Sequence, residues 1–144
     1  MYKIAIVDDD ELYGLAIRRY LSQKFEVSFF TKISSFLQSP CCYDLVIVDY
    51  SIPAARYEKQ MDGCDLICKL KETITNPPLF VLLTGFLTQN NLEFGKEICP
   101  QADSFLAKDT ALDAILQHIQ QLLESRNRKS GDKRHSIAGE QVGI

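Results

Sequence analysis

The sequence predicts an α/β fold built on a doubly wound, five-stranded parallel sheet with helices on both faces. Five short apolar segments alternate with segments of helical periodicity, which is typical of such sheets. The segment 45–48 is an unbroken aliphatic run, as expected of a parallel strand buried on both faces. Polar residues follow the apolar segments, where open α/β sheets place their functional sites.

Each predicted strand is short, apolar and followed by a polar residue or a chain breaker. The five strands span residues 2–7, 26–30, 45–48, 79–83 and 102–106. Pro53 ends any regular structure after the third strand, and Asn76-Pro77-Pro78 separates the third helix from the fourth strand.

Apolar residues at helical spacing predict five helices between and after the strands. The first carries Leu12, Leu15, Ala16, Tyr20 and Leu21, with Arg18 and Arg19 outside. A short second helix covers residues 34–39, a third follows Gly63, and a weak fourth covers 88–98. The last has the clearest apolar stripe: Leu112, Ile115, Leu116, Ile119, Leu122 and Leu123.

Composition indicates a soluble cytoplasmic protein. The 144 residues suit one domain with a real core, and the net charge of -3 gives no general attraction to nucleic acid or anionic membrane. No apolar run approaches the roughly 18 residues of a membrane helix, and the N-terminus has no signal-peptide layout. We therefore expect no membrane association and no direct nucleic-acid partner.

The five cysteines predict no disulfide framework. Their number is odd and their spacing matches no scaffold. Cys64 and Cys68 could share a helix face, but no second pair completes a zinc site. We expect the cysteines to be small buried hydrophobes.

Polar residues at four strand ends should meet at one edge of the sheet. They are Asp8 and Asp9, Asp49, Thr84 and Lys108. A pair of carboxylates 4 Å apart repels by about 4 kcal/mol at an effective dielectric of ~20. Mg²⁺, a hard cation with oxygen ligands, would relieve this repulsion. Such a site suits phosphoryl transfer to Asp49, with Thr84 as a hydrogen-bond donor and Lys108 as a counter-charge. Taken singly, most of these residues also have a structural explanation: Asp8 and Asp9 could cap the first helix, Asp49 could cap a turn, and Lys108 could be a solvated loop residue.

Over residues 2–124 the sequence resembles the receiver domain of bacterial two-component response regulators. The resemblance depends on four motifs in order: Ile6-Val7-Asp8-Asp9, Asp49-Tyr50-Ser51-Ile52-Pro53, Leu83-Thr84-Gly85 and Phe105-Leu106-Ala107-Lys108. It implies a (βα)5 flavodoxin-like fold with strand order 2-1-3-4-5. It also implies a signalling protein rather than an enzyme. Such a protein assists its own phosphorylation and dephosphorylation.

The resemblance also implies roles for single residues. Asp49 would accept a phosphoryl group from a sensor histidine kinase or a phosphotransfer protein. Asp9 would bind Mg²⁺ directly, Asp8 would assist, and Asp49 and the backbone carbonyl of Ser51 would complete the ligands. Lys108 would pair with Asp49 or its phosphoryl group. Thr84 and Phe105 would be a switch pair that changes the surface formed by the fourth helix, fifth strand and fifth helix. The same surface is where we expect a homodimer to form. Alternatively, Phe105 is a purely structural residue of the core.

Two other functions of the same fold class fit the sequence less well. A Mg²⁺-dependent phosphatase with an aspartyl nucleophile would need a second acid two residues after it, and Ser51 is there. A flavin-binding module would need a Ser/Thr/Gly-rich loop after the first strand, but Asp8-Asp9-Asp10 would repel a phosphate there.

Three features depart from the usual receiver pattern. Residues 54–62 enlarge the loop beside Asp49, and Asp109 stands where proline normally follows the lysine. Gly85, where a small residue is usual, leaves room for the phosphoryl group but adds backbone freedom.

Residues 1–124 should form the domain, and residues 125–144 a flexible basic tail or linker. This tail is too short to form a DNA-binding output domain. The sequence is compatible with a stand-alone receiver and with a piece of a longer regulator whose output domain is missing.

Overall fold

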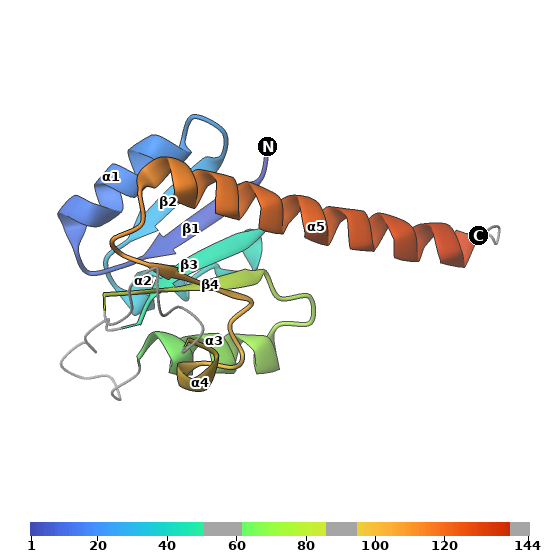
Figure 1. Cartoon of the computed structure of the whole chain (residues 1–144). Helices are drawn as coiled ribbons and strands as arrows, with labels where there is room; N and C mark the ends of the chain where they lie inside the picture. The colour runs from blue at the N-terminus through green and yellow to red at the C-terminus, as the bar shows by residue number, and fades with distance from the viewer. Residues whose placement is uncertain (51–61, 86–94, 139–144) are drawn as a thin grey trace. The chain divides into compact units, whose positions relative to one another are not determined.

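The chain is an alternating α/β protein (Figure 1). The computed structural model describes residues 1–50, 62–85 and 95–138. Its elements, in chain order, are β1 (Lys3–Val7), α1 (Glu11–Leu21), β2 (Glu26–Phe30), α2 (Ile33–Phe36), the 3-10 turn η1 (Pro40–Cys42), β3 (Leu45–Asp49), α3 (Gly63–Thr73), β4 (Leu79–Thr84), α4 (Gly95–Ile98), β5 (Ser104–Ala107) and α5 (Leu112–Ala138).

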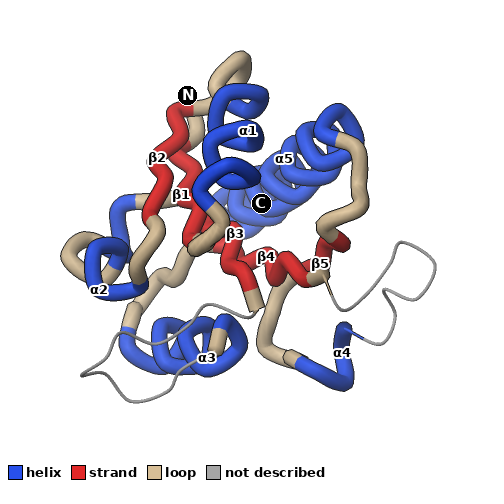
Figure 2. The backbone as a smooth tube through the Cα atoms, turned by 90° about the vertical axis from the view of Figure 1, so that its left-hand side faces the viewer, coloured by secondary structure: helices blue, strands red, loops and turns tan. Residues whose placement is uncertain are grey.

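The five strands form one parallel sheet in the order β2-β1-β3-β4-β5. This order confirms the predicted fold class. Figure 2 shows α1 on one face of the sheet and α3 on the other, as a doubly wound sheet requires. All five residues of β3 are buried, which explains why its sequence is continuously apolar up to Asp49.

The core beneath α2 and α3 is built from alternate strand residues. Ala5 and Val7 of β1 and Val46 and Val48 of β3 point into it, because successive side chains of a strand face opposite ways. The same cluster holds further buried residues of the helices and of β4: Ile33, Phe36, Leu66, Ile67, Leu70, Phe80, Leu82 and Cys99.

The first helix is present and Leu21 of its predicted apolar face is buried, but the rest of that face is predicted wrongly. Leu12 is 84% exposed and Leu15 41%, whereas Ile17 and Leu21 are buried. Gly14 decides the orientation: a Cβ at this position would overlap the ring of Phe29, so the glycine allows α1 to lie close against β2. The sequence pattern alone could not show which of two apolar stripes carries this contact.

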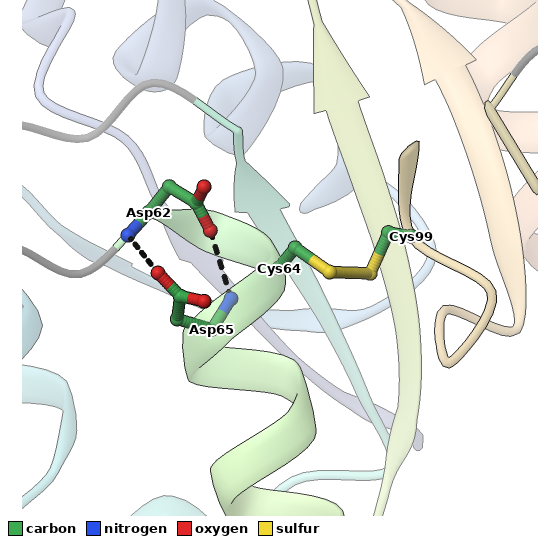
Figure 3. The surroundings of a disulfide bond; sticks show 4 residues. All are labelled: Asp62, Cys64, Asp65 and Cys99. Carbon is green, nitrogen blue, oxygen red and sulfur yellow. Dashed lines mark hydrogen bonds between the residues drawn. A yellow bond between two sulfur atoms is a disulfide. The ribbon is translucent and has the colours of Figure 1, made fainter. Parts of the chain in front are cut away.

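A reciprocal capping box starts α3 (Figure 3). The Asp62 carboxylate accepts from the backbone N–H of Asp65 at 2.8 Å, and the Asp65 carboxylate accepts from the N–H of Asp62 at 3.1 Å. Two donors that a helix start leaves unpaired are thereby satisfied. The helix begins at Gly63 itself.

The structure corrects the expectation for the cysteines. Cys64 at the start of α3 and Cys99 just after α4 form a disulfide, 35 residues apart in sequence (Figure 3). Cys41 and Cys42 are exposed, so they are not buried hydrophobes. A long-range pairing between two helices leaves no spacing signature in the sequence.

Other element bounds differ modestly from the prediction. α2 covers only residues 33–36, and Pro40 starts the turn η1 instead of merely ending a helix. Of the predicted fourth helix, residues 95–98 are helical, and residues 88–94 lie outside the described part of the chain. The enlarged loop at 54–62 also lies outside it, apart from Asp62.

α5 forms a separate compact unit from Asp113 onward. Ile115, Ile119 and Leu123 of its predicted stripe are buried. The helix continues to Ala138 and so includes residues assigned to the tail. The domain boundary at residue 124 stays a prediction. No described helix combines the length and the hydropathy that a membrane span requires.

Candidate functional site

The sheet register brings four polar residues to one edge. Val7 is paired with Val48, so Asp8 follows β1 beside Asp49, the last residue of β3. Thr84 ends the neighbouring strand β4. The backbone N–H of Lys108, just after β5, donates to the carbonyl of Thr84 at 3.0 Å. The parallel arrangement therefore places these residues together although they are far apart in sequence.

Three carboxylates form an acidic cluster at this edge. One oxygen from each of Asp8, Asp9 and Asp49 lies within 4.8 Å of the others. Asp8 is fully buried and Asp49 is 2% exposed, whereas Asp9 is exposed. The backbone N–H of Asp10 donates to Oδ1 of Asp8 at 2.9 Å and orients that carboxylate. Asp10, rather than Asp8 or Asp9, caps α1 by accepting from the N–H of Tyr13.

Lys108 is the cation of the cluster. Its Nζ lies 3.2 Å from Oδ2 of Asp8 and 3.5 Å from Oδ2 of Asp49, with a quarter of its side chain exposed. Burial by itself would lower the pKa of Lys108, but the negative charges of Asp49 and Asp8 outweigh that effect, and the pKa is raised. The lysine therefore remains charged and screens the two buried acids from each other.

Tyr13 is a site residue that sequence reasoning missed. The Nζ of Lys108 lies 5.1 Å from the centroid of the Tyr13 ring, within cation–π range. The hydroxyl of Tyr13 is buried and makes no hydrogen bond within the described part of the chain. Burial, followed by the charges of Asp8 and Asp49, raises the pKa of Tyr13 to about 12. The signal available in the sequence was Asp10: as helix cap it places residue 13 in the first turn, next to the acids.

Gly63 holds α3 close to the backbone of Asp49. Its N–H donates to the carbonyl of Tyr50 at 2.9 Å. A Cβ at Gly63 would overlap the Asp49 carbonyl and would lie 3.0 Å from the Cα of Tyr50. Only glycine allows this approach, so α3 supports the chain next to the carboxylate.

Thr84 and Phe105 lie on neighbouring strands. Thr84 is 1% exposed, and Phe105, paired with Leu82, is partly buried against the core cluster beneath α2 and α3. A Cβ at Gly95 of α4 would lie 2.6 Å from Cδ1 of Phe105, so this helix touches the ring closely. Ser51 lies outside the described residues.

The acidic cluster fits a magnesium ion chemically. Its donors are carboxylate oxygens, the ligand type that Mg²⁺ prefers, and they come from separate segments of the chain. The three carboxylate oxygens lie within 4.8 Å of one another, so these residues could hold such an ion together.

Known structures share this fold, although no family model and no curated protein matches the sequence. The BeF3-activated receiver domain of DrrB is 27% identical, with a TM-score of 0.69 over 86% of this chain and 98% of that domain. The response regulator DrrB of Thermotoga maritima, an OmpR/PhoB homolog, is 25% identical, with a TM-score of 0.71 over 88% of this chain. The match covers 54% of that protein, so this chain corresponds to about half of it.

A third structure supports the fold alone. A CheY-like response regulator receiver domain protein from Methanospirillum hungatei is 20% identical, with a TM-score of 0.72 over 90% of this chain and 98% of that one. The sheet order and the likeness to DrrB together show that the chain has the fold of a response regulator receiver domain.

Proposed function

We propose that this chain is a phosphoacceptor in two-component signalling, and that Asp49 receives the phosphoryl group. The observation that supports this most directly is the position of Asp49, which is 2% exposed at the end of β3. Its carboxylate lies 3.5 Å from the ammonium of Lys108 and close to two further carboxylates. The donor is a sensor histidine kinase or a phosphotransfer protein. The likeness to receiver domains supports this choice of partner.

In the proposed reaction an oxygen of Asp49 attacks the phosphorus of a phosphohistidine. The new O–P bond forms as the N–P bond breaks, and the electron pair of that bond leaves with the imidazole nitrogen, which is then protonated. Lys108 leaves its pairing with the Asp49 carboxylate and contacts the phosphoryl oxygens, where it offsets the negative charge. Thr84 donates its hydroxyl to the same oxygens.

Asp8, Asp9, Asp49 and the backbone carbonyl of Ser51 would hold Mg²⁺. When bound, this ion neutralises charge on the transferring group and on the acids around it. The repulsion among the three carboxylates supports the assignment, because a single ammonium leaves a net negative cluster.

Phosphorylation is proposed to act through Thr84 and Phe105. As Thr84 turns toward the phosphoryl group, Phe105 moves inward and changes the surface of α4, β5 and α5. The close contact between Gly95 and the Phe105 ring supports a coupling of this ring to α4. We also propose that the protein forms a homodimer through α4, β5 and α5. An output domain outside this sequence and a cytoplasmic location are further parts of the proposal. The protein acts as a signalling module and not as a turnover enzyme, although it assists its own phosphorylation and dephosphorylation.

Intact-protein mass spectrometry after incubation with acetyl phosphate and Mg²⁺ tests the proposal. The native chain should gain the mass of one phosphoryl group, and Asp49→Asn should gain none. Asp113→Asn, at an exposed position of α5, is the matched control and should label like the native chain. Equal labelling of Asp49→Asn and the native chain would refute the assignment.

A further inference from the structure

Three groups surround the ammonium of Lys108: the carboxylates of Asp8 and Asp49 and the ring of Tyr13. The carboxylates hold it by charge, at 3.2 and 3.5 Å. The ring holds it through the electrons of its face, with the Nζ 5.1 Å from the centroid. All of these residues belong to one compact unit, Met1–Leu112.

These groups differ in how they respond to a cation on the acids. A divalent ion on the acidic cluster would offset two of its three negative charges and would repel the ammonium, because ion and ammonium are both positive. The attraction of the Tyr13 ring does not depend on free carboxylates. The ring therefore keeps its full attraction for Lys108 when the attraction of the acids is weakened.

The hydroxyl of Tyr13 does not explain why this side chain occupies the site. It is buried and makes no hydrogen bond among the described residues, so it contributes desolvation without compensation. The ring of Tyr13 contacts Lys108.

We infer that Tyr13 is a positioning residue for phosphoryl transfer, whose ring keeps the Lys108 ammonium beside Asp49 while the acidic cluster holds a cation. The inference rests on the proposed phosphoacceptor function. The proposed effect of Tyr13 passes through Lys108, which its ring contacts.

Kinetics of labelling by acetyl phosphate with saturating Mg²⁺ test this role. Tyr13→Leu removes the ring and should slow labelling roughly 2- to 30-fold, the range that a cation–π contact represents. Tyr13→Phe keeps the ring and should recover most of that rate. Tyr20→Leu, on the same helix but remote from the acids in sequence, controls for the general loss of a tyrosine from α1.

A second measurement does not require phosphorylation. Comparison with the spectrum of Lys108→Arg identifies the NMR resonances of the Lys108 side chain in the full chain. The quantity measured is the ring-current shift of the methylene protons next to Nζ, with and without Mg²⁺. The native chain and Tyr13→Phe should show shifted resonances in both conditions, and Tyr13→Leu should show those of a solvated lysine.

The two measurements separate the possible failures. If the native chain is not labelled on Asp49, the proposed function fails, whatever the NMR shows. If labelling proceeds but Tyr13→Leu labels as fast as the native chain, or Tyr13→Phe is as slow as Tyr13→Leu, the positioning role of the ring is overturned. Loss of the ring-current shift in the native chain on adding Mg²⁺ also overturns it.

Discussion

The carboxylate of Asp8 and the ammonium of Lys108 lie 3.2 Å apart, although 100 residues separate them in sequence. Asp8 is fully buried and a quarter of the Lys108 side chain is exposed, so this ion pair joins the ends of β1 and β5 at a partly buried position. A buried carboxylate without its partner is costly, whereas exposed pairs contribute little.

Removing the charge of Lys108 should therefore destabilise the metal-free protein. We expect Lys108→Met to lower the free energy of unfolding by about 1–3 kcal/mol, because Asp8 and Asp49 then face each other without a counter-charge. Added Mg²⁺ should reduce the deficit. Lys3→Met, which breaks the exposed pair of Lys3 with Glu26 at 3.8 Å, is the control and should cost less than about 1 kcal/mol. Urea titrations with and without Mg²⁺ measure all of these values, and equal losses in the two variants would contradict the expectation.

Asp9 and Asp10 are adjacent but should differ in metal affinity. Asp9→Asn should weaken Mg²⁺ binding about tenfold or more, because it removes a carboxylate from the acidic cluster. Asp10→Asn should change it only slightly, because Asp10 caps α1 and asparagine caps equally well. Isothermal titration with Mg²⁺ distinguishes the two. Similar losses would show that the acidic run is assigned in the wrong register.

Gly63→Ala should disturb the support of Asp49. The added methyl group overlaps the Asp49 carbonyl, which is backbone and cannot rotate away, so α3 must shift. We expect a loss of about 1–3 kcal/mol in the free energy of unfolding. Gly85→Ala is the matched control, because its Cβ would meet no atom of the described residues within 4 Å. Thermal unfolding of both variants tests the comparison, and a Gly63→Ala protein as stable as Gly85→Ala would disprove this packing argument.

The disulfide between Cys64 and Cys99 should stabilise the fold. Cross-links over 35 residues typically contribute about 2–4 kcal/mol by restricting the unfolded chain. A thiol reductant should therefore lower the stability of the native chain and leave Cys64→Ser unchanged. Cys41→Ser, which removes an exposed free thiol, should respond to the reductant like the native chain. A reductant effect of equal size in Cys64→Ser would exclude this pairing as its cause.

Alkaline pH should destabilise the site. The pKa of Tyr13 is raised from 10.0 to about 12 by burial and by the acids, and that of Lys108 is raised above 10.5 by Asp49 and Asp8. The folded state thus binds more protons than the unfolded state at alkaline pH. The stability that these two groups contribute is therefore full below pH 10 and is lost as the pH rises through their pKa values in the folded state. Denaturant titrations between pH 9 and pH 12 should show a shallower decline for Tyr13→Phe than for the native chain. Identical pH profiles would show that Tyr13 does not contribute.

Local patterns in the sequence were sufficient to predict the strands and the sheet. The run 45–48 is apolar at every position because β3 is buried on both faces, and this property is visible without any coordinates. The alternation of strands and helices also depends on neighbours in sequence. So do the polar residues at the ends of β1, β3, β4 and β5. Roles assigned to Asp8, Asp9, Asp49, Thr84, Lys108 and Phe105 remain predictions.

Only the tertiary structure decided which distant surfaces touch. It turned α1 so that Ile17 is buried and Leu12 is exposed, because Gly14 lets the helix approach Phe29. It joined Cys64 to Cys99, and it placed the ring of Tyr13 beside Lys108. Each of these contacts depends on the distance between elements that are remote in the chain, and a local pattern of hydrophobicity or charge carries no information about that distance.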